Sequence, residues 1–150
     1  MKTFEFNYEN ILKYKEHLYD MAKLEYQTLS SKVQMIARLE EQIQKNMQEE
    51  RERLQLSLVA HASIREVRMQ HWYIGQLEER KKVLGNEKEK LSVDLDAVRY
   101  KCIECKRERD QLSHLKDEQR EEFVQEVDRF EQKEVDDYFN AVHVHRNHNG

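Results

Sequence analysis

Proline is absent from this chain of 150 residues, and glycine occurs only three times. Because proline breaks helix interiors and glycine weakens them, their scarcity favours long uninterrupted helices. The two cysteines are too few for a disulfide framework. No run of about eighteen apolar residues occurs, so we expect no membrane insertion. The N-terminal segment carries charges throughout and lacks the apolar centre of a secretory signal, which favours a cytoplasmic location.

The charge balance is mildly acidic. Lys and Arg number 26 against 30 Asp and Glu, which gives a net charge of −4. We therefore expect no nucleic-acid partner, because such proteins present a strongly basic face. Charged residues make up 37% of the chain, hydrophobic residues 38%, and the mean hydropathy is −1.03. This composition is too polar for a rounded core, yet it suffices for narrow apolar seams between helices.

Two long runs of residues at alternating steps of three and four are typical of a coiled coil. The first run is Tyr26, Leu29, Val33, Ile36, Glu40, Ile43, Met47, Glu50 and Leu54. The second run is Ile74, Leu77, Lys81, Leu84, Lys88, Leu91, Leu95, Val98, Cys102, Cys105, Arg109 and Leu112. Before the first run, Ile11, Leu18 and Ala22 extend the seam with one irregular step, which predicts a local unwinding of the supercoil.

A break between the two runs predicts that the chain folds back on itself. The heptad phase is lost after Leu54, and Ser63 with Glu66 has the spacing of a capping box, which marks a helix start. We predict helix one over about 4–56, a turn at about 57–63, and helix two over about 64–142. The fold class is therefore all-α: one domain over 1–150, a long antiparallel two-helix coiled-coil hairpin. A single unbroken helix with a phase shift is the alternative.

The C-terminal part of helix two is predicted to overhang. Folding back near residue 60 sets Phe4 opposite Lys116 and Lys81 near Glu40, which leaves the later residues without an intramolecular partner. This overhang carries an apolar stripe of Phe123, Val127 and Phe130, followed by Tyr138 and Phe139. Residues 116–138 hold ten acidic and four basic side chains. An uncovered apolar stripe of this kind usually meets another chain. At about 1.5 Å per residue, the helices would be about 75 Å and about 120 Å long.

Aromatic side chains supply the other candidate contact sites. Trp72, Tyr73 and Ile74 are consecutive, so a helix turns them to different faces and at least one large aromatic is exposed. Such a residue is either a binding hot spot or an ordinary surface aromatic. Phe4 and Phe6 either pack at the start of helix one or contact a partner.

Reactive residue types do not form a catalytic arrangement, and we expect neither catalysis nor a cofactor. Cys102 and Cys105 lie on seam positions, where small apolar residues are usual, and a zinc site would need two further ligands. The C-terminal histidines, which are His143, His145 and His148, could bind a transition metal or belong to a frayed terminus. Gly75 and Gly85 predict soft points or close approaches of two backbones.

The sequence resembles the FliJ family of flagellar type III export proteins over essentially its whole length. The matching stretches are Phe4-Glu5-Phe6 leading into Ile11–Glu16, Glu25-Tyr26-Gln27, Gln70-His71-Trp72-Tyr73 with Leu77, and Asp117-Glu118 with Arg120 leading to Glu134–Asp137. The resemblance implies a non-enzymatic hairpin that resembles the stalk of a rotary ATPase. Its partners would be a FliI-like hexameric export ATPase, the cytoplasmic domain of a FlhA-like export gate, and export chaperones. The chain would then lie at the cytoplasmic face of the inner membrane.

The resemblance also assigns contact residues. Tyr73 and Leu77 match the positions that meet the export gate. Trp72 is assigned to the same contact, although the family commonly has Gln at its position. The end that carries both termini would enter the ATPase ring, which assigns to this contact Phe4, Phe6, Phe123, Val127 and Phe130. Two alternatives remain open from the residues alone: a homodimeric structural coiled coil unrelated to export, and a metal sensor that uses the C-terminal histidines.

Overall fold

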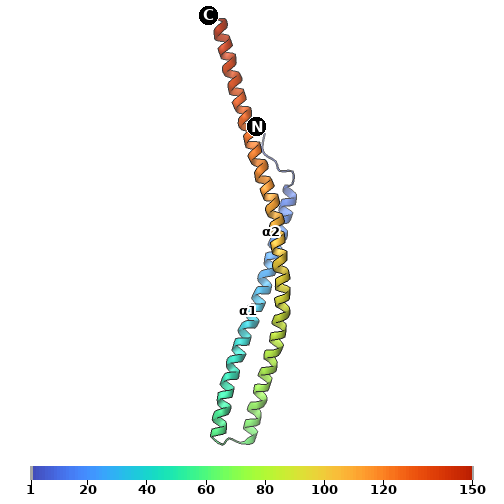
Figure 1. Ribbon diagram of the computed structural model, residues 1–150, viewed down its shortest axis with the longest axis vertical. Coiled ribbons are helices and arrows are strands. Elements are labelled where there is room, and N and C mark those ends of the chain that lie inside the picture. Colours follow the sequence, from blue (N-terminus) through green and yellow to red (C-terminus); the bar gives the residue numbers. More distant parts are fainter. Residues whose placement is uncertain (1, 150) are drawn as a thin grey trace. The chain divides into compact units, whose positions relative to one another are not determined.

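The computed structural model describes residues 2–149 and contains two long helices packed against each other (Figure 1). Helix α1 spans Glu9–Val59 and helix α2 spans Ile64–His148. The predicted all-α hairpin is confirmed, and the described residues form no strand. Helix α1 begins five residues later than the sequence pattern predicts, and α2 runs six residues further. Residues 1 and 150 lie outside the described part of the chain.

Contacts divide the chain into two units. The larger unit, called here the hairpin unit, is Asp20–Glu104 and contains the turn. The other, called here the terminal unit, joins the residues up to Tyr19 to those from Cys105 onward. Each unit therefore has its own pair of helical segments, one from α1 and one from α2.

The turn between the helices is a tight four-residue connection. The Ala62 backbone N–H donates to the Ser57 carbonyl at 3.0 Å, and the His61 N–H donates to the Leu58 carbonyl at 3.4 Å. These two bonds are the Schellman pattern, which satisfies the last carbonyls of a helix. His61 takes the left-handed position of this motif with φ of 54°. On the other side, the Glu66 N–H donates to Ser63 Oγ at 3.3 Å, as expected for the predicted helix cap.

The predicted seam is buried in the hairpin unit. Every position of the first run is buried or half-buried, and in the second run Lys81 is the one exposed position. Ile43, Met47 and Leu77 form the central cluster, with Leu84 packed against it. Fully burying one such aliphatic side chain contributes about 1.5–3 kcal/mol, so this cluster is a main source of stability for the unit.

The fold-back register differs from the predicted one. Lys81 donates to Gln44 Oε1 at 2.6 Å, and Lys88 is the residue that meets Glu40, at 3.4 Å. The prediction that Lys81 lies near Glu40 is therefore wrong by about one helical turn of α1, since Gln44 is four residues after Glu40. The sequence places the turn only approximately, and the structure centres it on Ala60–Ser63. In an antiparallel pair, the numbers of two facing residues add up to twice the number at the centre of the turn. An error in the position of the turn therefore appears twofold in the predicted pairing of residues.

The start of the α1 seam also needs a correction. Leu12 is the buried residue, with 4% of its surface exposed, whereas Ile11 is 47% exposed. From Leu12 the heptad steps pass through half-buried Lys15 and Tyr19 to buried Ala22 and then reach Tyr26 without interruption. The predicted stutter is therefore wrong, since it arose from choosing Ile11 over Leu12. The true seam includes Lys15, a charged residue that an apolar pattern passes over.

The two internal glycines do not mark close backbone contacts. A Cβ atom added to Gly75 or Gly85 would meet no described atom within 4 Å apart from the local helix backbone. Neither glycine has a positive φ. The close approach offered as one explanation is therefore wrong, and both residues sit in ordinary helix with open space beside them.

Candidate interaction surfaces

The N-terminal segment, residues 2–8, lies along α2 in the terminal unit (Figure 1). The ring of Phe4 packs against Phe123 of α2 with centroids 5.7 Å apart. The guanidinium of Arg120 lies 5.7 Å from the centroid of the same Phe4 ring, within the range of a cation–π contact. Phe6 is buried and meets Tyr8 edge to face. The predicted placement of Phe4 opposite Lys116 is wrong, and Phe123 has an intramolecular partner after all.

Ion pairs fasten this end of α1 to α2. Lys116 Nζ meets Glu9 Oε2 at 2.8 Å, and Lys15 Nζ donates to Glu108 Oε2 at the same distance. Each hydrogen bond holds the pKa of its carboxyl below the usual range, because the bond and the lysine charge both favour the carboxylate. The Arg109 guanidinium lies 4.6 Å from the Tyr19 ring centroid. Polar and aromatic contacts thus join the two helices of the terminal unit alongside the burial of Phe6 and Leu12.

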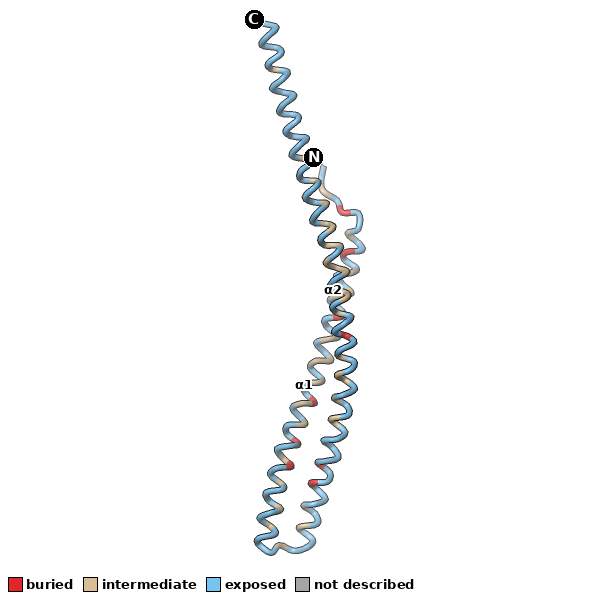
Figure 2. The backbone as a smooth tube through the Cα atoms, viewed as in Figure 1, coloured by how far each residue is buried: buried red, intermediate tan, exposed pale blue. Residues whose placement is uncertain are grey.

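Beyond Phe123, the C-terminal part of α2 is exposed almost throughout (Figure 2). From residue 128 to residue 149, Val142 alone is half-buried and every other described residue is exposed. Val127 is half-buried, whereas Phe130 is 62% exposed. The exposed apolar side chains of this part are Val124, Phe130, Val135, Tyr138, Phe139 and Val144. Phe123 and Val127 are thus the half-buried residues of the predicted stripe, and Phe123 is covered by the Phe4 ring. Phe130 is the solvent-exposed residue of the stripe.

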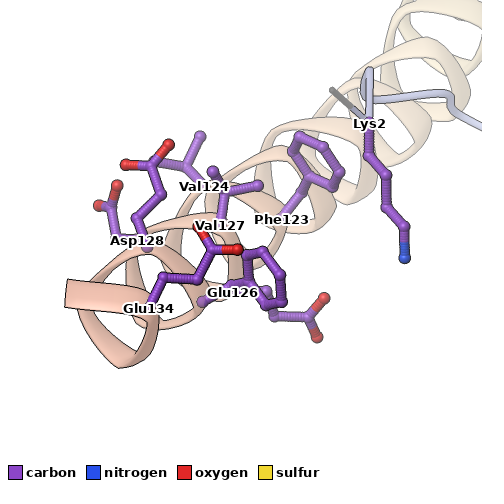
Figure 3. A pocket seen from close by; sticks show the side chains of 9 residues that line it. Lys2, Phe123, Val124, Glu126, Val127, Asp128 and Glu134 are labelled. Atoms are coloured by element: carbon purple, nitrogen blue, oxygen red, sulfur yellow. The ribbon is translucent and has the colours of Figure 1, made fainter. Parts of the chain in front are cut away.

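A hollow of about 700 Å³ lies over this stripe (Figure 3). Its apolar part is formed by Phe123, Val124, Val127 and Phe130, and its acidic part by Glu126, Asp128, Glu131 and Glu134. Lys2 also lines it and lies beyond Phe123 at one end, while Asp128 and Glu134 lie at the other. The three predicted stripe residues on α2 therefore share one surface, which we call the acidic hollow.

The second candidate surface lies near the turn in the hairpin unit. Trp72 is 65% exposed and Tyr73 is 41% exposed, as expected for side chains that cannot enter the seam. Leu77 is only 7% exposed and belongs to the central apolar cluster. Other exposed apolar residues in this stretch are Leu56, Leu58, Val59, Ile64 and Met69. Sequence reasoning missed these as surface residues, although the loss of heptad phase after Leu54 was the available signal.

The thiol and imidazole groups do not come together. Cys102 and Cys105 are half-buried on the seam and form no disulfide. Among residues 2–149, no group of three or more His, Cys, Asp or Glu side chains is placed to hold a metal ion. His143 Nε2 lies 3.4 Å from the side-chain nitrogen of Asn147. The histidine tail therefore offers no assembled metal site in the described part of the chain.

Within residues 2–149, neither helix contains a stretch long and apolar enough to cross a bilayer. The helix pair defines a class of protein, the α-helical coiled-coil hairpin, here with exposed apolar side chains along its helices. The family model described as "Flagellar FliJ protein" matches residues 4–149, and the chain belongs to the FliJ family. Membership implies a role connected with flagellar protein export. Searches of curated proteins and of solved structures gave no significant match.

Proposed function

We propose that this chain is a non-enzymatic coiled-coil component that links the export ATPase ring to the membrane export gate and engages export chaperones. It would act at the cytoplasmic face of the inner membrane without inserting into it. Family membership supports the export role, and the exposed apolar surfaces of the two units support action through contacts. Exposed aromatic residues are typical of binding hot spots, whereas isolated aliphatic residues on a surface need no such explanation.

The ATPase contact is proposed for the exposed stripe of the terminal unit. Phe130 is open to solvent, and Val127 and Phe123 continue the stripe toward the N-terminal segment. The single observation that carries this proposal is that helix α2 continues from residue 128 to His148 almost fully exposed, with large apolar side chains along it. Phe4 and Phe6 border this contact, and buried Phe6 would act by holding the N-terminal segment in place.

The gate contact is proposed for Trp72 and Tyr73. Both aromatic rings are exposed on α2, and Met69 is exposed one turn before Tyr73. Leu77 supports this contact from inside, because its side chain packs on Ile43 and Met47 and is not available to a partner while the helices are paired. The chaperone contact is not assigned to particular residues.

The test is a pair of double variants measured against two partners. Phe123→Ala with Phe130→Ala is expected to weaken binding to purified export ATPase about tenfold or more, because hot-spot aromatics cost at least about 2 kcal/mol on truncation. Trp72→Ala with Tyr73→Ala is expected to spare ATPase binding and weaken binding to the gate's cytoplasmic domain. Tyr100→Ala is the matched control, since Tyr100 is an exposed aromatic on α2 outside both surfaces. Equal affinity of either double variant and the control would contradict that assignment.

A homodimer is the second candidate, because another copy of the chain could cover the exposed stripe. Light scattering of the full chain at micromolar concentration distinguishes the two. A stable dimer that Phe130→Ala dissociates supports the structural coiled coil. A monomer that binds the export ATPase supports the stalk.

A further inference from the structure

The acidic hollow has carboxylates without a counter-ion among the residues that the structure describes. Its four acidic residues, Glu126, Asp128, Glu131 and Glu134, make no ion pair with any residue in 2–149. Elsewhere in the terminal unit, the carboxylates of Glu9, Glu108 and Asp110 each pair with a basic group. Grouped charges of one sign beside apolar side chains raise the local concentration of an oppositely charged partner.

The N-terminal segment of the chain itself binds at one end of this surface. Lys2 brings one ammonium group to the end of the hollow (Figure 3). Two residues further on, Phe4 packs its ring against Phe123, which lines that end. The Phe4 ring covers Phe123 and is in turn covered by Arg120. Lys2 lines the hollow without pairing to any described carboxylate. The segment therefore fills one end and leaves Phe130 and the acidic residues around it open.

We propose that the acidic hollow binds a short basic segment of a partner protein, with a Lys or Arg next to a bulky apolar residue, and that residues 2–8 compete for the same surface. The charge of the hollow selects the basic residue, and Phe123, Val127 and Phe130 receive the apolar one. Partner binding then displaces the Phe4 ring from Phe123. This inference rests on the proposed ATPase contact, for which it names the chemistry of the partner segment and gives Phe4 the role of competitor.

Competition makes a prediction that a direct contact does not. Were Phe4 a partner contact, Phe4→Ala would weaken binding. As a competitor, Phe4 lowers the fraction of molecules with Phe123 uncovered, so Phe4→Ala is expected to tighten binding about threefold. Buried Phe6 stays in place in this variant, so helix α1 keeps its packing at the N-terminal end.

The probe is a fluorescein-labelled synthetic peptide, KKLFKLFK, titrated with the full chain and followed by anisotropy. The charge-reversed peptide EELFELFE is the control ligand. Glu126→Gln with Glu131→Gln is expected to weaken binding of the basic peptide about fivefold. Glu121→Gln with Glu122→Gln removes the same net charge from exposed positions of the same helix outside the hollow, and little change is expected. Circular dichroism verifies that each variant keeps the helix content of the unchanged chain.

Three outcomes would overturn the proposal. Equal weakening by the two Glu→Gln pairs would mean general electrostatic attraction to the acidic helix. Equal binding of the basic and reversed peptides would remove the charge selection. Unchanged or weaker binding with Phe4→Ala would remove the competition. Any of these, together with loss of ATPase binding in Phe123→Ala with Phe130→Ala, would leave the proposed function standing and remove this inference alone.

Discussion

Lys15 of α1 donates a hydrogen bond to Glu108 of α2 across 2.8 Å, from a seam position where a coiled coil normally holds an apolar residue. The Lys15 side chain is 28% exposed, so its charge is partly removed from water. The bond raises the pKa of Lys15 and lowers that of Glu108, so both groups favour the charged pair. In the terminal unit, helix pairing therefore depends on ionisation as well as on apolar burial.

Acidification is expected to weaken the terminal unit through these pairs. The pKa values of Glu9 and Glu108 lie below their ordinary value of 4.5, so their stabilisation is present above that pH and is lost as the pH falls through the lowered values. Glu9→Gln with Glu108→Gln should therefore show a smaller drop in Tm between pH 7 and pH 3 than the unchanged chain. Thermal melts followed at 222 nm measure this difference. An equal drop in both proteins would contradict the prediction.

The two glycines inside α2 predict straightforward stabilisation. Gly75→Ala and Gly85→Ala should each raise the free energy of unfolding by about 1 kcal/mol, since alanine restricts the unfolded chain and the added methyl group meets no neighbour. Urea unfolding monitored by circular dichroism gives the values. Ser92→Ala, a change between two non-glycine residues in the same helix, is the control and should have a smaller effect. Destabilisation by either Gly→Ala change would show that α2 requires flexibility at that point.

The turn offers a second stability test. His61 adopts φ of 54°, a conformation that costs little for glycine and more for residues with a Cβ. His61→Gly should stabilise the hairpin unit by about 0.5–1 kcal/mol, and His61→Val should destabilise it by a similar amount or more. Chemical denaturation of the three proteins measures both shifts. The His61 side chain is exposed, so packing does not confound the comparison. Equal stabilities of the three proteins would mean that the turn relaxes to another conformation.

Substitutions at Leu77 and Trp72 distinguish a role in helix packing from a role in partner contact. Leu77→Ala should lower the free energy of unfolding by about 2–4 kcal/mol, because it leaves a cavity beside Ile43 and Met47. Trp72→Ala should change it by less than about 0.5 kcal/mol, since the ring is mostly exposed. If Leu77→Ala lowers gate affinity, the loss should follow the loss of helix pairing and be reversed only in part by Gly75→Ala, whose stabilisation is smaller. A loss of affinity with full stability would instead make Leu77 a direct contact.

The fold could be predicted from the sequence because apolar residues recur at the heptad spacing over many heptads. Apolar residues stand at most of the expected seam positions and are buried at Ile36, Ile43, Met47 and Leu77. No proline interrupts the helices. The exposure of Trp72 and Tyr73 followed from the same geometry, since neighbouring residues on a helix point about 100° apart. Family membership was likewise indicated by the order of short motifs along the chain.

Other features could not be read from the sequence. Ile11 and Leu12 are adjacent and equally apolar, so the pattern alone does not select the buried one. The covering of Phe123 by Phe4 depends on a non-helical segment, which has no periodicity to predict its position. The register depends on the centre of the turn, and that turn lacks the glycine or proline that usually marks one.

The Schellman turn also limits how the hairpin unit can move. With only four residues between Val59 and Ile64, and with both flanking helix ends hydrogen-bonded, the connection has no spare length to absorb a slide of one helix past the other. A one-turn slip of about 5.4 Å would break those bonds and misalign every layer of the seam. Any mechanical signal that crosses this unit must therefore travel as bending or twisting of the helix pair. The turn keeps the register of the two helices fixed while they bend or twist.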